Sequence, residues 1–87
     1  MASFKIIFKQ SVAKDLCRIP NQEVAKILDR IEVLAAEPRS LGAEKLSSQE
    51  KYRIRQGVYR IIYEVVDKEL IVVIIKVGHR RDVYSSN

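Results

Sequence analysis

Residues 51–63 constrain the fold of this chain more than any other stretch, because they read as a β-hairpin with a defined turn. Apolar and basic side chains alternate on both sides of Gly57 and Val58. Glycine at the first position of a two-residue turn suits a type II′ geometry, which needs a positive φ there. We therefore expect Gln56 to pair with Tyr59, and this pairing sets the register of both strands.

The expected register divides the side chains of the hairpin between a basic face and an apolar face, because paired residues share a face of the sheet. Arg55 faces Arg60, and Arg53 lies on the same side. The other side holds Tyr52, Ile54, Ile61 and Tyr63. Three guanidinium groups on one face repel one another, and phosphate is an anion that arginine binds through two points. The hairpin thus predicts an anion-binding face.

The distribution of charge along the chain favours a polyanionic partner. The formal net charge is +5, of which residues 45–87 carry +4 and residues 1–44 carry +1, so the excess lies with the hairpin. A basic surface that serves only solubility is the alternative. A length of 87 residues and a hydrophobic share of 47% are typical of one folded domain, which we expect to span residues 1–87.

The composition also indicates the cellular setting. A single cysteine, Cys17, excludes an internal disulfide and favours a reducing cytoplasm, and we expect it to be a packing residue in a helix. Lys5 and Lys9 interrupt the apolar N-terminal run, which therefore lacks the core of a signal peptide. The apolar run at residues 70–75 is too short to span a membrane. One histidine and one cysteine cannot form a metal site alone, so we expect neither metal nor cofactor.

The remaining pattern predicts the element order β-α-α-β-β-β. Strands are expected at residues 3–8, 51–56, 59–66 and 69–77, and helices at about residues 10–18 and 21–37. Asn21 is the expected N-cap of the second helix, and Pro38 stops it. Tight turns make the last three strands neighbours, with the first strand next to the last one. We expect an α+β fold in which a helical hairpin packs on a small, mainly antiparallel four-stranded sheet.

The tail after the last strand adds reactive groups to the basic face. Gly78 allows a turn that would bring His79, Arg80, Arg81 and Tyr84 toward the hairpin. Arginine stabilises charge on phosphate, histidine transfers protons near neutral pH, and tyrosine can stack on an unpaired base. No Mg²⁺-binding set of carboxylates is evident, and metal-free cleavage would use the ribose 2′-hydroxyl, which makes RNA the expected substrate.

Two motifs together resemble the RelE/ParE superfamily of bacterial toxins, and most closely its RelE branch. They are the Tyr-Arg-x-x-Tyr pattern at Tyr59–Tyr63 and the tail Val-Gly-His-Arg-Arg-Asp-Val-Tyr at residues 77–84. The likeness extends over essentially the whole chain. It implies a cytoplasmic toxin of a type II toxin–antitoxin system that cleaves messenger RNA in the A site of the 70S ribosome without metal. It also implies a cognate antitoxin that holds the toxin inactive, and a pair that represses its own operon by binding operator DNA.

The resemblance implies roles for individual residues. Arg60 matches the phosphate-stabilising arginine of the family. Arg80 matches an arginine proposed as general acid or leaving-group stabiliser, and Tyr84 matches the aromatic residue that stacks on the substrate base. Arg53 and Arg55 stand where well-known members have lysines, one of them proposed as the base. Arginine stays protonated at physiological pH, so neither suits a general base.

The general base is therefore open between several groups. Glu44 and His79 fall where the YoeB-like branch has a catalytic glutamate and histidine, which would give a base and an acid. An unusually perturbed arginine or a group of the ribosome are the other options. Lys45 and Arg81 are candidate contacts to phosphate or ribosomal RNA.

Each assignment has a structural alternative. Arg60 could pair with Glu64, Arg53 and Arg55 could form structural ion pairs, and Tyr84 could anchor the tail on the core. Simple exposure is the alternative for Glu44, Lys45 and His79, and Arg81 could contact only the antitoxin. For the whole protein, the alternatives are a ParE-like inhibitor of DNA gyrase, which needs no acid–base residues, and a binding module without catalytic activity.

Overall fold

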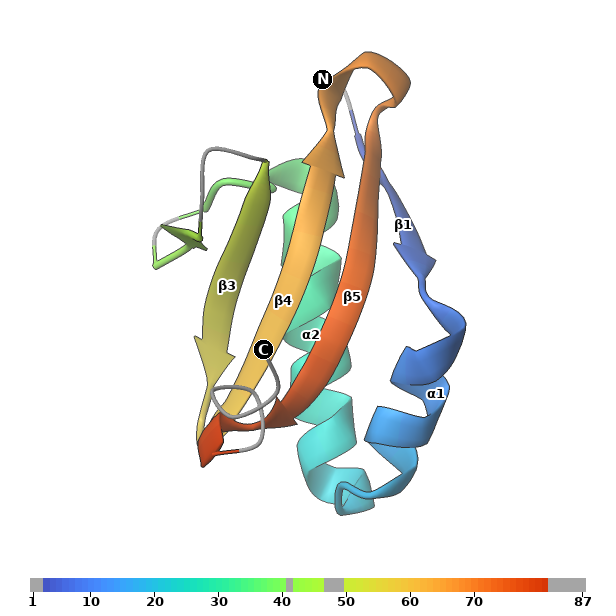
Figure 1. Ribbon diagram of the computed structural model, residues 1–87, viewed down its shortest axis with the longest axis vertical. Coiled ribbons are helices and arrows are strands. Elements are labelled where there is room, and N and C mark those ends of the chain that lie inside the picture. Colours follow the sequence, from blue (N-terminus) through green and yellow to red (C-terminus); the bar gives the residue numbers. More distant parts are fainter. Residues whose placement is uncertain (1–2, 41, 47–49, 82–87) are drawn as a thin grey trace.

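The structure, a computed structural model, describes residues 3–40, 42–46 and 50–81. Two helices pack on one face of a five-stranded sheet and leave the other face open (Figure 1). In chain order the elements are β1 (Lys5–Phe8), α1 (Gln10–Cys17), α2 (Asn21–Ala36), β2 (Glu44–Lys45), β3 (Lys51–Gln56), β4 (Tyr59–Val66), a 3₁₀ turn (Asp67–Glu69) and β5 (Ile71–His79). No helix of the described residues is long and apolar enough to cross a bilayer.

The sheet confirms the expected α+β fold. Its strand order is β1-β5-β4-β3-β2, with β1 parallel to β5 and all other pairs antiparallel. The first strand therefore joins the last one, as expected. The two-residue strand β2 adds a fifth member to the four expected strands, because Glu44 and Lys45 pair with Arg53 and Tyr52.

The β3–β4 hairpin has the register that the sequence predicts. Gln56 pairs with Tyr59, Arg55 with Arg60, and the ladder continues in step to the start of β3. Gly57 has a φ of +61°, whereas Val58 has no positive φ, as a type II′ turn requires. The turn and the alternation of side chains therefore act together to fix which residues share a face.

The core lies between the helices and one face of the sheet. Helix α2 contributes Ile27, Ile31 and Leu34, each at most 2% exposed. The sheet contributes the buried side chains Tyr52, Ile54, Ile61, Tyr63, Val65, Val72, Ile74 and Val77. The expected packing role of Cys17 is wrong, because Cys17 is the last residue of α1 and is exposed. Phe8, at the end of the edge strand β1, is also exposed.

The start of α2 differs from the expected N-cap. Asn21 is the first helical residue, and Pro20 is the cap, with φ −55° and ψ 141°. The carbonyl of Pro20 accepts hydrogen bonds from the N–H groups of Glu23 and Val24, so the first turn forms without a side-chain cap. Proline suits this place because its fixed φ is compatible with an extended residue that leads into a helix.

Strand β5 differs from expectation at both ends. A 3₁₀ turn and Leu70 in the left-handed region (φ +55°) replace the tight turn, so β5 begins at Ile71. The strand then runs through Gly78 to His79, and the expected turn at Gly78 is wrong. Gly78 pairs with Arg60 and His79 with Tyr59, so the ladder to β4 continues past Gly78. Earlier in β5 a bulge leaves Ile75 as an extra residue, because Ile62 and Tyr63 pair with Lys76 and Ile74.

The upper end of the sheet in Figure 1 is held by an ion-pair cluster of Arg39, Glu50, Tyr52 and Asp67, called here the Arg39 cluster. Arg39 donates to Asp67 Oδ2 over 2.7 Å, to Glu50 Oε2 over 3.1 Å and to the Tyr52 hydroxyl over 2.8 Å. These bonds raise the pKa of Arg39. Hydrogen bonds from Arg39 lower the pKa of Asp67, and hydrogen bonds from Tyr52 and Arg39 lower that of Glu50.

Tyr63 connects this cluster to the core. Its ring stacks on Tyr52 at a centroid distance of 5.7 Å, and its hydroxyl donates to the Pro38 carbonyl over 2.5 Å. Burial raises the pKa of Tyr63 to about 12. The loop after α2 is thus tied to both central strands.

Candidate functional site

The open face of the sheet carries a group of arginines at the hairpin end, called here the arginine face. The register places Arg55, Arg60 and Gly78 in one row across β3, β4 and β5. The next row consists of Glu44, Arg53, Ile62 and Lys76. Adjacent strands lie about 4.8 Å apart, so each row brings its side chains within reach of one small anion or of its neighbours.

Arg60 lies at the centre of the arginine face and is only 6% exposed. Its guanidinium donates to two carbonyls, over 3.0 Å to Tyr59 and over 3.3 Å to Gly57. Its Nε is buried without a hydrogen-bond partner, and no carboxylate of the described residues pairs with it. The alternative pairing with Glu64 is therefore not formed. A buried charge without a counter-charge is costly, and an anion next to this guanidinium would reduce that cost.

Arg53 and Glu44 form an ion pair between β3 and β2. Arg53 therefore forms the structural ion pair that was the alternative to a binding role. Arg55, two residues after Arg53 on the same side of β3, is exposed. A small cleft of about 240 Å³ lies among Gly42, Glu44, Arg53 and Arg55, and it opens on the arginine face. The structure therefore brings one carboxylate next to the two arginines that replace the lysines of the family.

Lys45 does not belong to the arginine face. It pairs with Tyr52 in the ladder, which puts its side chain on the side opposite to that of Glu44. Its Nζ lies 3.8 Å from Glu50 Oε1, close to the Arg39 cluster. Lys45 is therefore separated from the other candidate residues by the thickness of the sheet.

The end of β5 returns to the hairpin turn as the sequence predicts, although through a longer strand. The backbone N–H of Arg80 donates to the Val58 carbonyl over 2.8 Å, so Arg80 lies beside the turn that Arg60 also contacts. The side chains of Arg80 and Arg81 are exposed. Tyr84 lies outside the described residues.

His79 points away from Arg60. It pairs with Tyr59, whose side chain alternates with that of Arg60 and therefore faces the helices. The two rings meet edge to face, with centroids 6.1 Å apart and planes at 82°. The N–H of Arg81 donates to Nδ1 of His79 over 3.2 Å, so a neutral imidazole in this position carries its proton on Nε2 and acts as a donor there.

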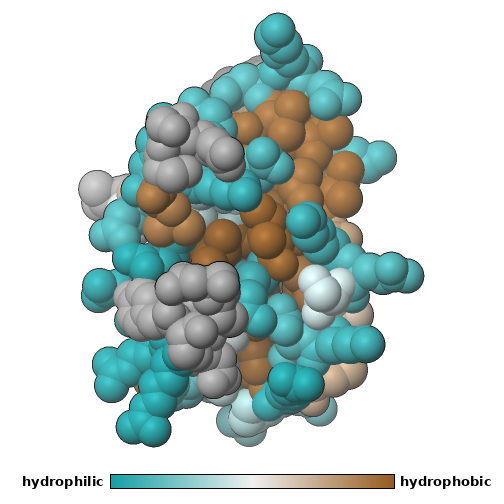
Figure 2. Space-filling model, in the orientation of Figure 1, coloured by the Kyte–Doolittle hydropathy of each residue, from teal (hydrophilic) through white to brown (hydrophobic). Residues whose placement is uncertain are grey.

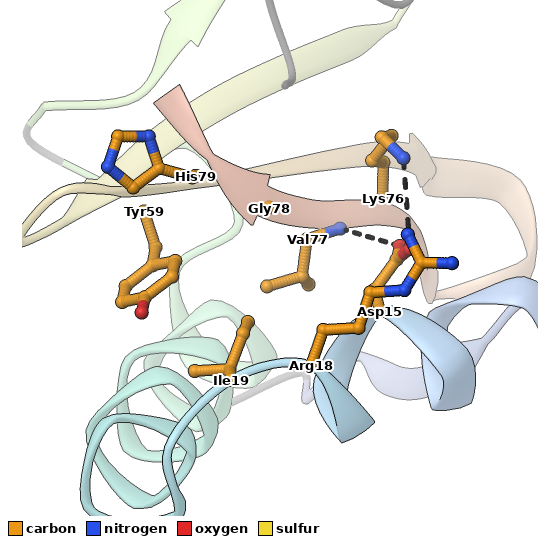
Figure 3. Close-up of a pocket in the computed structure, with 8 residues that line it drawn as sticks. All are labelled: Asp15, Arg18, Ile19, Tyr59, Lys76, Val77, Gly78 and His79. Carbon is orange, nitrogen blue, oxygen red and sulfur yellow. Dashed lines mark hydrogen bonds and ion pairs between the residues drawn. The ribbon is translucent and has the colours of Figure 1, made fainter. Parts of the chain in front are cut away.

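A second cleft lies at this end of the molecule, between α1 and β5, and is called here the α1–β5 cleft (Figure 3). It is lined by Asp15, Arg18, Ile19, Tyr59, Lys76, Val77, Gly78 and His79 and encloses about 320 Å³. Asp15 Oδ2 accepts a hydrogen bond from the N–H of Val77 over 3.2 Å, and Oδ1 lies 3.7 Å from Lys76 Nζ. The sequence gives no sign that Asp15, Arg18 and Lys76 lie together, because three segments distant in sequence form this cleft.

Beyond the arginines, the open face carries a group of apolar side chains. Ile7, Ile62, Val66, Ile71 and Val73 follow one another across β1, β5 and β4 on this side. Figure 2 shows the apolar side chains as a brown area in the upper right part of the molecule, next to the polar lower part. The described residues contain no group of three His, Cys, Asp or Glu side chains that could hold a metal ion.

These features define a toxin of the RelE/ParE superfamily. The sequence model described as "ParE toxin of type II toxin-antitoxin system" matches residues 6–84, and the chain belongs to this family. It is 28% identical to toxin RelG of Mycobacterium tuberculosis, over 93% of this chain and 95% of RelG. It is 30% identical to a protein of Methanocaldococcus jannaschii named RelE1, over 95% of this chain and 97% of that protein.

Solved structures agree with this assignment. A chain of the RelBE2 toxin–antitoxin complex of M. tuberculosis superposes with a TM-score of 0.81 at 26% identity, covering 92% of this chain and 94% of that chain. A mutant of the Escherichia coli toxin RelE in the free state gives a TM-score of 0.78 at 26% identity, covering 98% of this chain and 93% of that chain. Both a complexed and a free toxin therefore share the fold of this chain.

Proposed function

We propose that this toxin is a ribosome-dependent endoribonuclease that cleaves messenger RNA in the A site of the 70S ribosome. The observation that carries the proposal is Arg60, which is buried, charged and paired only with carbonyls. A guanidinium held in this way is ready to bind a phosphate and to stabilise the charge that develops on it during cleavage. The RelE names of the relatives support the same activity.

In the proposed reaction, the ribose 2′-oxygen attacks the adjacent phosphorus and the bond from phosphorus to the 5′-oxygen breaks. The products are a 2′,3′-cyclic phosphate and a 5′-hydroxyl. Arg55 and Arg60 bind the phosphate oxygens, and Arg53 keeps Glu44 on the arginine face, where its carboxylate can accept the 2′-hydroxyl proton. Arg80, beside the hairpin turn, donates a hydrogen bond to the leaving 5′-oxygen, which takes up a proton from water.

The remaining candidate residues have supporting roles in this proposal. Tyr84 stacks on the substrate base, and Arg81 contacts ribosomal RNA. His79 is assigned to neither base nor acid at the cleaved phosphate, because its ring lies on the helix side of the sheet. Lys45 contacts ribosomal RNA from the other side of the sheet, outside the arginine face.

The proposal includes regulation by a partner. A cognate antitoxin holds the toxin inactive in the cytoplasm, and the pair binds operator DNA and represses its own operon. Related toxins are seen in RelB–RelE complexes, including one from Methanococcus jannaschii with 29% identity to this chain and a TM-score of 0.70. The exposed edge of β1, with Ile7 and Phe8, and the apolar part of the open face offer surface for such a partner.

Induction of the toxin without its antitoxin, followed by mapping of messenger RNA ends on translating ribosomes, tests this function. We expect cuts at A-site codons, and these cuts should persist on purified programmed ribosomes when Mg²⁺ is lowered to the minimum that keeps the ribosome assembled. Arg60→Ala removes the cuts, whereas Lys68→Ala keeps them. Lys68 is a matched control because it removes one cation from the opposite end of the sheet.

Intact messenger RNA with gyrase-linked DNA breaks would replace the proposal by the ParE-like alternative. Normal growth with intact RNA would leave a binding module without catalytic activity. The role of Glu44 has its own test, because Glu44→Gln keeps the size of the side chain and removes the base. We expect single-turnover cleavage to slow about 100-fold. An unchanged rate would assign the base to the ribosome or to another residue.

A further inference from the structure

The α1–β5 cleft is separate from the arginine face, although both meet at the end of β5. Strand β1 pairs with β5 only as far as Ile74, so β1 does not cover the edge of β5 beyond the bulge. Helix α1 lies across that edge, and the cleft remains between them (Figure 3). Its volume of about 320 Å³ falls at the lower end of the roughly 300–1,000 Å³ that ligand sites enclose.

The floor and one wall of the cleft are apolar and aromatic. Ile19 and Val77 lie at the base, with exposures of 8% and 1%. Tyr59 forms the wall on the side of the hairpin, with its ring half-buried, and His79 stands beside it in the edge-to-face contact. Two flat rings next to an apolar floor suit a flat, partly apolar ligand such as a nucleobase.

The opposite wall is cationic. The carboxylate of Asp15 is already bound by the N–H of Val77 and by Lys76, so it does not need a ligand. Arg18, the C-cap of α1, extends from the helix end toward β5 (Figure 3). Within residues 3–40, 42–46 and 50–81, its guanidinium forms no hydrogen bond or ion pair. The cleft therefore holds two cations against one carboxylate, an excess that favours an anion.

The cleft and the arginine face are one residue apart along the chain. Tyr59 lines the cleft and Arg60 lies on the arginine face, with about 3.8 Å between their Cα atoms. Gly78 pairs with Arg60 and also lines the cleft, so no side chain separates the two sites at that point. A flexible chain bound by Arg60 can therefore pass over the end of β5 into the cleft.

We propose that the α1–β5 cleft binds a nucleotide of single-stranded RNA next to the one whose phosphate lies at Arg60. The base packs against Tyr59 and His79, and its phosphate lies beside Arg18. This inference rests on the proposed RNA substrate, and it adds a second base contact to a site that the arginine face alone would bind only through phosphate. His79 acts here as a hydrogen-bond donor through Nε2.

Direct binding tests the cleft without any cleavage step. The isotope-labelled full chain is titrated with an RNA tetranucleotide that carries 2′-O-methyl groups, which cannot supply the attacking hydroxyl, and amide chemical shifts are followed. We expect shifts at Val77, Gly78 and His79. Arg18→Ala and Tyr59→Leu should each raise the Kd for the tetranucleotide about 5- to 10-fold. Tyr59→Phe, which keeps the ring, should bind like the wild type.

Lys14→Ala is the matched control, because it removes a cation from the same helix outside the cleft. An equal loss of affinity in Lys14→Ala would reduce the effect to non-specific charge and overturn the inference. If inorganic phosphate alone shifts the amides of the cleft as much as the tetranucleotide does, the contact with a base is overturned. Chemical-shift changes confined to the arginine face would overturn RNA binding in the cleft but leave the proposed function intact. Normal RNA binding in the cleft without any cuts in messenger RNA on the ribosome would overturn only the proposed cleavage reaction.

Discussion

Two arginines at opposite ends of the same sheet have opposite surroundings. Arg39 binds two carboxylates and a tyrosine hydroxyl, and 39% of its side chain is exposed. Arg60 is 6% exposed, and two carbonyls are its hydrogen-bond acceptors. The more buried cation has the weaker partners, which is the reverse of what stability alone would favour.

This difference fits a structural role for Arg39 and the proposed phosphate-binding role for Arg60. Arg39 lies in the loop after α2, and its partners come from the start of β3 and the turn before β5, so its bonds hold together three parts of the chain. The partners of Arg60 are carbonyls of its own hairpin, so they position the guanidinium and leave its charge available. Changes at the two ends should therefore affect different properties.

Arg60→Met should produce the largest effect. We expect cleavage on the ribosome to fall about 100- to 1,000-fold, because the charge opposite the reacting phosphate is lost. The free energy of unfolding should stay the same or rise, since an apolar side chain of similar length replaces a buried charge without a counter-charge. Urea unfolding and single-turnover cleavage measure both quantities. A loss of stability equal to the loss of activity would make Arg60 a structural residue.

Tyr63→Phe should make the free energy of unfolding less sensitive to high pH than it is in the wild type. The folded pKa of about 12 lies above the ordinary value of 10.0, so the contribution of Tyr63 is complete below pH 10 and is lost as the pH rises toward 12. The wild type should lose about 3 kcal/mol over this range from Tyr63. The variant should lack this part of the loss, and parallel curves of wild type and variant would contradict the assignment.

Arg39→Met should lower stability without lowering activity. The variant loses the hydrogen bond to the largely buried Tyr52 hydroxyl, which corresponds to about 1 kcal/mol of unfolding free energy. The exposed ion pairs to Asp67 and Glu50 add little. Cleavage by the folded protein should change less than about threefold. A strong loss of cleavage at full folding would mean that this end of the sheet also contacts the substrate.

Acid should have the smallest effect. The pKa values of Asp67 and Glu50 are lowered below their ordinary values of 3.8 and 4.5, so their contribution is complete above those values and is lost as the pH falls through the folded pKa values. The urea midpoint of the wild type should therefore decrease between pH 5 and pH 3. Arg39→Met should show a weaker decrease, and an identical pH dependence would contradict the cluster.

The hairpin was predictable from the sequence because its rules are local. The glycine turn sets the register of β3 and β4, and the alternation sets the faces of Arg53, Arg55 and Arg60. The fold class followed from the order of elements, as did the return of Arg80 to the turn. The side of the sheet that His79 occupies was not predictable. The sequence suggested a turn at Gly78, whereas Gly78 and His79 are the last two residues of β5.

Strand β2 and the Arg39 cluster depend on contacts between distant segments. Glu44 and Lys45 have no strand pattern of their own and pair only because Arg53 and Tyr52 are already fixed in β3. Arg39 follows a proline in a polar loop, where its sequence neighbours give no sign of Asp67. The burial of Arg60 without a carboxylate likewise appears only after the whole sheet is assembled.

The extra residue in β5 has a consequence for how toxins of this kind can diverge. Removal of Ile75 would leave Ile74 opposite Tyr63 and Lys76 opposite Ile62, so the ladder and the row of Arg55, Arg60 and Gly78 would stay in register. The local bend of the strand would be lost, and with it the angle at which the end of β5 meets α1. Under the proposed function, deletion of a single codon would thus alter the surroundings of the α1–β5 cleft and leave the arginine face intact.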